Sequence, residues 1–119
     1  MAEARTYQGG CHCGAVRYSV TTDLAQVIEC NCSHCAKKGF LLTFVPTDQF
    51  ELTSGEEQLS EYLFNTGKIR HRFCKVCGVQ SFAEGAMPDG QPMRAVNLRC
   101  VEGVDPKALE PIPVDGANF

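Results

Sequence analysis

The residues best suited to chemistry in this sequence are its eight cysteines, seven of which occur in three closely spaced clusters. The clusters are the C-x-C pair Cys11 and Cys13, the C-x-C-x-x-C group Cys30, Cys32 and Cys35, and the C-x-x-C pair Cys74 and Cys77, whereas Cys100 stands alone. A C-x-x-C turn points two sulfurs at one point, and a glycine directly after it, here Gly78, permits the tight backbone of a zinc knuckle. Clustered thiols of this kind indicate metal binding.

The spacing of the clusters predicts two different zinc sites. Structural zinc usually takes four ligands in two pairs, so Cys11, Cys13, Cys74 and Cys77 are expected to form one closed site. The middle cluster supplies three sulfurs, and three protein ligands with one open position are typical of catalytic zinc. Either Cys100 or a solvent molecule would fill the fourth position. Spacing alone leaves other arrangements open: the first pair with the middle cluster, a single zinc with free thiols, disulfides, or an iron–sulfur centre.

Length and composition indicate one small domain, which we expect to span residues 1–119. Hydrophobic residues make up 44% of the chain, enough for a packed core, and no apolar run approaches the roughly 20 residues of a membrane span. The N-terminal residues lack the apolar stretch of a secretory signal, so we expect a cytoplasmic protein whose thiols stay reduced. The formal net charge of −3 argues against a nucleic-acid partner.

The periodicity of the sequence predicts a mainly β protein built of short antiparallel sheets. Residues 15–20 and 94–98 alternate apolar and polar side chains, and residues 58–64 also suggest a strand, whereas no segment keeps a helical period over three turns. Residues 33–38 are expected to form one helical turn with Ser33 as its cap, and the last ten residues to be irregular. Short strands bury little surface, so such a domain needs the stabilisation that zinc would supply.

Four motifs in this order resemble those of the glutathione-dependent formaldehyde-activating enzyme family, which includes centromere protein V-like domains. They are Gly9-Gly10-Cys11-His12-Cys13-Gly14-Ala15-Val16-Arg17-Tyr18, Cys30-Asn31-Cys32-Ser33-His34-Cys35-Ala36-Lys37-Lys38-Gly39, residues 62–66 with Arg70-His71-Arg72-Phe73-Cys74-Lys75-Val76-Cys77-Gly78-Val79-Gln80-Ser81-Phe82, and Arg94-Ala95-Val96-Asn97-Leu98-Arg99-Cys100. Together the motifs cover nearly the whole chain, from about residue 7 to residue 106. After Asn65-Thr66 this chain has Gly67-Lys68, where many relatives have His.

The resemblance implies a tent-like arrangement of small antiparallel sheets held together by two zinc ions. By motif match, Cys11, Cys13, Cys74 and Cys77 would hold the structural ion, and Cys30, Cys32 and Cys35 the catalytic one. The namesake activity is the condensation of formaldehyde with glutathione to S-(hydroxymethyl)glutathione, a carbon–sulfur lyase reaction in reverse. Glutathione and formaldehyde, or a related thiol and small aldehyde, are therefore the expected substrates.

Two groups of residues are candidates for the steps beyond metal binding. A zinc-bound thiolate would attack the aldehyde, and the resulting alkoxide needs a proton donor, for which His34 and His71 are the candidates. Both histidines could instead hydrogen-bond cysteine sulfurs without any role in catalysis. Lys37, Lys38 and Arg70 would attract an anionic thiol such as glutathione, or else offset thiolate charge. The alternative function is a non-catalytic zinc module that binds a protein or nucleic acid.

Overall fold

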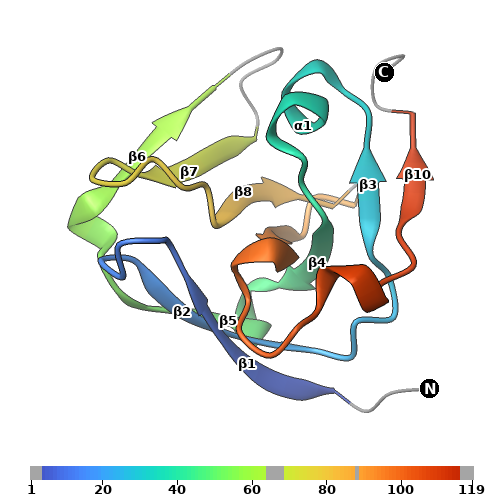
Figure 1. The fold of residues 1–119 in the computed structure, drawn as a ribbon, viewed down its shortest axis with the longest axis horizontal. Coiled ribbons are helices and arrows are strands. Elements are labelled where there is room, and N and C mark those ends of the chain that lie inside the picture. Colours follow the sequence, from blue (N-terminus) through green and yellow to red (C-terminus); the bar gives the residue numbers. More distant parts are fainter. Residues whose placement is uncertain (1–3, 64–68, 88, 116–119) are drawn as a thin grey trace.

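Two β-sheets make up most of the computed structural model, which describes residues 4–63, 69–87 and 89–115 (Figure 1). The smaller sheet has the order β1-β2-β5 and is antiparallel, with β1 at Arg5–Gly10, β2 at Arg17–Thr22 and β5 at Phe50–Ser54. The larger sheet has the order β10-β3-β4-β9-β8-β7-β6. Its strands are β3 (Ile28–Cys30), β4 (Leu42–Pro46), β6 (Leu59–Tyr62), β7 (Arg70–Cys74), β8 (Phe82–Ala86), β9 (Pro92–Asn97) and β10 (Ile112–Val114). These sheets confirm the mainly β fold.

The helices that the structure describes are short. The six-residue α1 (Ser33–Lys38) is the one α-helix of the described residues, and the others are 3₁₀ turns of three residues each. These turns are η1 (Thr47–Gln49), η2 (Glu56–Gln58), η3 (Leu98–Cys100) and η4 (Pro106–Ala108). No helix in this part of the chain is long and apolar enough to cross a membrane.

The hydrophobic core lies between the two sheets, where alternate side chains of both point inward. From β2, Tyr18 is fully buried and stacks on Phe50 of β5, with ring centroids 4.9 Å apart. Phe82 of β8 extends this aromatic group, with its ring centroid 4.8 Å from that of Phe50. Val45 and Val96 fill the space beside it from the central strands of the larger sheet. One shared core therefore holds the two sheets against each other.

Strand alternation also decides which side chains of β7 meet the helix. Neighbouring residues of a strand point to opposite faces of its sheet. Arg72 pairs across the sheet with Phe82, a core residue, so Arg72 and Arg70 lie on the face toward the smaller sheet. His71 lies on the other face, where its ring meets His34 of α1. The register of β7 therefore separates its arginines from its histidine.

Two local expectations were wrong. The N-cap of α1 is Cys32 and not Ser33, because the sulfur of Cys32 accepts the backbone N–H of Cys35 and thereby replaces the usual oxygen acceptor. The C-terminal segment contains a strand, β10, which pairs in parallel with β3, so the sheet is not antiparallel throughout. The backbone bond from Ile112 N to Val27 O, 2.7 Å long, begins this pairing.

One stretch of the third sequence motif cannot be compared with the structure. The strand expected at residues 58–64 is found as β6. The last residue of the expected strand, Phe64, and residues 65–68 lie outside the described part of the chain.

A glycine in the turn between β5 and η2 allows this turn to pack closely on the segment that leads into β2. Gly55 has φ +90°, and a Cβ there would lie 2.1 Å from the carbonyl oxygen of Ala15. Gly90 has nearly the same φ, +91°, but no described atom lies within 4 Å of the position that a Cβ would take there. We therefore expect Gly90→Ala to lower the free energy of unfolding by about 1 kcal/mol and Gly55→Ala by about 3 kcal/mol or more. Urea unfolding of the metal-loaded protein measures both, and equal losses would show that the close approach at Gly55 is unimportant.

Candidate metal centres and the adjoining cavity

Four cysteines from two distant segments meet where the sheets come together. Cys11 and Cys13 follow β1 of the smaller sheet, whereas Cys74 ends β7 of the larger sheet and Cys77 lies in the turn after it. The four sulfurs lie within 4.8 Å of one another. Cys11 and Cys74 are buried, and Cys13 is exposed. The structure thus brings together the four residues predicted for the closed site.

Each pair of cysteines is held in a tight backbone turn. The N–H of Gly14 donates to the carbonyl of Cys11, and that of Gly78 to the carbonyl of Cys74, over 3.3 and 2.7 Å. Both glycines have φ near +80°, which a residue with a Cβ adopts only with strain. In these turns backbone N–H groups point at sulfur. For example, the N–H of Val16 donates to Sγ of Cys11 over 3.3 Å. These turns present the sulfurs as acceptors on a common side.

The backbone of these turns also favours ionised sulfur. The Val79 N–H and the Cys13 N–H both donate to Cys77, and they lower the pKa of its thiol to about 6. Burial opposes the ionisation of Cys11, but the Val16 N–H and the thiols of Cys13 and Cys74 together outweigh it, so the pKa of Cys11 is lowered. Thiolates are the form of cysteine that binds metal.

The middle cluster forms a second group of sulfurs at the start of α1. Cys30 ends β3, Cys32 caps the helix and Cys35 lies in its first turn, and their sulfurs also lie within 4.8 Å of one another. The helix ends at Gly39, whose φ of +69° lets its N–H return to the carbonyl of Cys35. Burial opposes ionisation of Cys32, but the Cys35 N–H, 3.4 Å from its sulfur, helps to lower the pKa of Cys32.

The sulfur geometry fits a shared tetrahedral metal. Zinc–sulfur bonds of about 2.3 Å place the sulfurs of a tetrahedral site about 3.8 Å apart. The observed separations are 3.6 Å between Cys11 and Cys13 and 3.7 Å between Cys13 and Cys74. A disulfide would need about 2.05 Å. The four-cysteine cluster therefore has the spacing that a thiophilic ion such as zinc requires, and both clusters have the donor atoms.

Cys100 belongs to neither cluster. Its sulfur lies 3.6 Å from the side-chain nitrogen of Asn97 and 3.8 Å from the carbonyl oxygen of Gln80. Burial raises the pKa of the Cys100 thiol, and the nearby Cys11 and Cys77 raise it further. Cys100 thus lies beside the four-cysteine cluster as a neutral thiol, and it does not complete the three-cysteine group.

The two histidines predicted as proton donors lie against each other. The rings of His34 and His71 are 4.4 Å apart between centroids, and His34 also stacks on Tyr62 and contacts Phe40. The side-chain amide nitrogen of Gln80 donates to Nδ1 of His71 over 3.2 Å, which places the ring proton of a neutral His71 on Nε2. Burial lowers the pKa of His71 to about 4, with a smaller contribution from His34, so His71 is neutral at pH 7.

A cavity of about 430 Å³ adjoins the middle cluster, and Cys30 and Cys35 form part of its wall. The rest of the lining combines apolar and charged residues, among them Glu29, Phe40, Arg99, Val114 and Asp115. Arg99 is held in place because its Nε donates to the carbonyl of Gly39 at the end of α1, over 2.8 Å. Neither His34 nor His71 lines the cavity, but Phe40, which does, contacts the ring of His34.

Arg99 is the cavity residue that sequence reasoning missed. It lies 60 residues from Gly39, and no local pattern marks it as a partner of the helix. Of the cations that were predicted to bind substrate, Lys37 and Lys38 are exposed in the last turn of α1, and Lys38 contributes to the lowered pKa of His34, after burial. Arg70 points to the opposite face of β7 from His71, so the structure does not bring it to the middle cluster.

The basic run around β7 does not form an open cationic surface. Arg72 donates to Glu84 over 2.6 Å, and Arg70 pairs with both Glu61 and Glu84. These ion pairs join neighbouring strands, and their side chains lie on the same face of the sheet. The cations of β7 are thus compensated within the sheet, which leaves little positive field for a nucleic acid.

Comparison with known proteins agrees with this geometry. The family of the glutathione-dependent formaldehyde-activating enzyme matches residues 6–113, a range that contains all the clustered cysteines. A crystal structure of a Rhodobacter sphaeroides protein, a structural genomics target, is similar with a TM-score of 0.78 and 30% sequence identity. That similarity covers 89% of this chain and 97% of the other protein. The chain belongs to the glutathione-dependent formaldehyde-activating enzyme family.

Proposed function

We propose that this protein is a cytoplasmic, zinc-dependent carbon–sulfur lyase-type enzyme that reversibly adds the thiol of glutathione to formaldehyde or a related small aldehyde. In that addition a carbon–sulfur bond forms, and the proton of the thiol ends on the carbonyl oxygen. The observation that supports the proposal most directly is a three-thiol cluster open to a cavity of about 430 Å³. Sites with three protein ligands and a neighbouring cavity are typical of catalytic zinc.

The metal would be held by Cys30, Cys32 and Cys35, whereas Cys11, Cys13, Cys74 and Cys77 would hold a second, structural ion. Zinc bound to three thiolates leaves one position for a further sulfur and lowers the pKa of a thiol that reaches it. The fold would leave this fourth position open to the cavity, because two of the three cysteines line the cavity wall.

The charged rim of the cavity suits a zwitterionic tripeptide. Glutathione carries two carboxylates and one ammonium group. Arg99 offers a guanidinium whose remaining N–H groups can bind a carboxylate, and Glu29 and Asp115 offer acceptors for an ammonium group. Lys37 and Lys38 add positive charge on the adjacent helix. These contacts would hold the thiol near the cysteine cluster.

His34 and His71 are the proposed proton carriers. His71 presents a neutral ring with its proton on Nε2, and Gln80 holds that tautomer. The His34 ring contacts both His71 and Phe40 of the cavity wall, so the pair adjoins the cavity.

Metal analysis tests the assignment of two sites. We expect two zinc ions per chain in the purified protein, and one in a Cys32→Ser variant that remains folded. Cys74→Ser should unfold the domain more than Cys32→Ser does, because it opens the site that joins distant segments. Thermal melting compares the two variants. Equal melting temperatures, or one zinc ion in the unmodified protein, would contradict the division into a closed and an open site.

Exchange NMR of formaldehyde with glutathione tests the activity. The spontaneous reaction is fast, so the rate without protein is subtracted. We expect acceleration by the zinc-loaded protein and none by Cys32→Ser. Arg99→Gln should raise the KM for glutathione about tenfold with little change in kcat, because it removes a charge-assisted hydrogen bond made in the ground state.

Arg5→Gln, which removes an exposed arginine at the start of β1, is the matched control and should leave KM unchanged. A similar rise of KM in both variants would show a general effect of net charge. No acceleration by the unmodified protein would leave a zinc-binding module without this activity.

The role of His71 is tested by His71→Gln. If the ring carries the proton, kcat should fall about 100-fold at unchanged KM, since general acid–base groups contribute about this much. Zinc content and melting temperature are measured on the same sample. A normal kcat in a folded variant with two zinc ions would exclude proton transfer through His71.

A further inference from the structure

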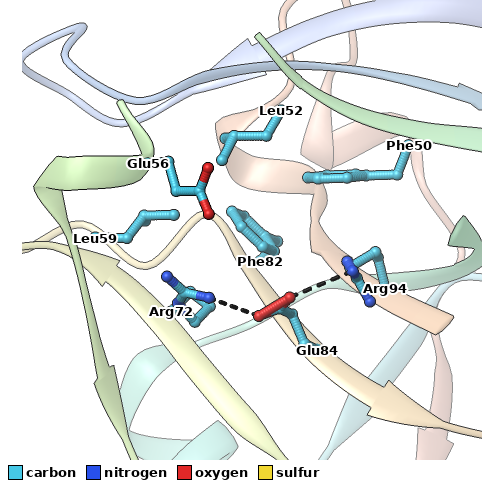
Figure 2. Close-up of a pocket in the computed structure, with 8 residues that line it drawn as sticks. All are labelled: Phe50, Leu52, Glu56, Leu59, Arg72, Phe82, Glu84 and Arg94. Atoms are coloured by element: carbon cyan, nitrogen blue, oxygen red, sulfur yellow. Dashed lines mark hydrogen bonds and ion pairs between the residues drawn. The ribbon is translucent and has the colours of Figure 1, made fainter. Parts of the chain in front are cut away.

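A second cleft, whose lining contains no cysteine, opens between the two sheets. Its volume is about 220 Å³, and it is formed by β5 and η2 on one side and by strands β6 to β9 on the other (Figure 2). The residues around it are Phe50, Leu52, Glu56, Leu59, Arg72, Phe82, Glu84 and Arg94. It shares no residue with the cavity beside the middle cysteines. The cleft is therefore a separate candidate site.

The larger sheet supplies a row of charged groups to this cleft. Glu84 of β8 accepts Arg72 of β7 over 2.6 Å and faces Arg94 of β9 over 3.3 Å, as Figure 2 shows. Together with Arg70 outside the cleft, 3.8 Å from Glu84, three guanidinium groups thus share this one carboxylate. The Nε of Arg72 is buried and has no hydrogen-bond partner among the described residues. A buried donor without a partner is unfavourable, and an incoming carboxylate would satisfy it.

Both sides of the cleft contribute apolar side chains, and η2 adds one acidic group. The rings of Phe50 and Phe82 lie 4.8 Å apart, and Leu52 and Leu59 extend the apolar surface. The carboxylate of Glu56, at the start of η2, points into the cleft in Figure 2. An occupant thus meets donors on the larger sheet, an acceptor on η2 and apolar surface between them.

We propose that this cleft binds a free α-amino acid with an apolar side chain. Its carboxylate would bind Arg72, its ammonium group would bind Glu56, and its side chain would pack on Phe50 and its apolar neighbours. The lining carries two arginines and two glutamates, so a zwitterion leaves its charge balanced, whereas a simple anion or cation does not. The volume of about 220 Å³ is below the roughly 300–1,000 Å³ of pockets for drug-sized molecules, which selects a small occupant.

Titration of the zinc-loaded full chain with L-phenylalanine, followed by amide NMR shifts, tests the proposal. We expect saturable binding with the largest shifts at β5, η2 and β8. Two comparison compounds separate the charged groups: 3-phenylpropionate lacks the ammonium group, and 2-phenylethylamine lacks the carboxylate. Each should bind about tenfold more weakly or worse, since each loses a charge-assisted contact. Absence of saturable binding by L-phenylalanine, or equal binding of either comparison compound, would overturn the proposal.

A variant of the exposed acidic residue tests the same contact from the protein side. Glu56→Gln should weaken L-phenylalanine binding about tenfold and leave 3-phenylpropionate unaffected. Glu57→Gln, one residue further in the same turn and outside the cleft lining, is the matched control and should bind as the unmodified protein does. Equal affinities of the two variants for L-phenylalanine would overturn the role of Glu56 and with it the proposal.

Discussion

The meeting of two cysteine turns at one point is the constraint on which the rest of this fold depends. Cys13 and Cys74 are 61 residues apart in sequence, yet their sulfurs are 3.7 Å apart. One turn extends from the smaller sheet and the other from the larger, so the cluster fixes how the sheets approach. Four thiolates with their sulfurs within 4.8 Å of one another would repel each other unless they share a cation. A metal ion there would close a long loop in a domain whose short strands bury limited surface.

The position of the open cluster follows from the closed one. Cys74 ends β7, and three residues earlier the same strand presents His71 to α1. Gln80, which follows the second turn, bonds to His71 and accepts the side chain of Asn97 through its carbonyl, so a buried polar network continues to the end of β9. Two residues further on, Arg99 holds the other end of α1. A helix of only six residues is thus placed by contacts with strands that the first cluster orients.

How much the sequence predicts depends on how local the determining contacts are. The cysteine clusters were predictable, because each turn is set by residues within a few positions and by a glycine after the last sulfur. The alternating strands were predictable for the same reason. The parallel pairing of β10 with β3 and the contact of Arg99 with Gly39 depend on residues far apart in sequence, so no local pattern indicates them. Cys32 in place of Ser33 as cap was missed because capping preferences rest on oxygen acceptors.

Charge would distinguish the two clusters if each held a divalent ion. A divalent ion with four thiolates carries a net charge of −2, and with three thiolates −1, so an ion held by the three-cysteine cluster would repel an anion less. The fold adds to this difference by the placement of its cations. Arg70 and Arg72 are paired with carboxylates on the inner face of the larger sheet, whereas Arg99, beside α1, bonds to a backbone carbonyl and lines the cavity. The register of β7 therefore leaves these two arginines paired with carboxylates of their own sheet, whereas Arg99 keeps N–H groups beside the middle cluster that can bind a carboxylate.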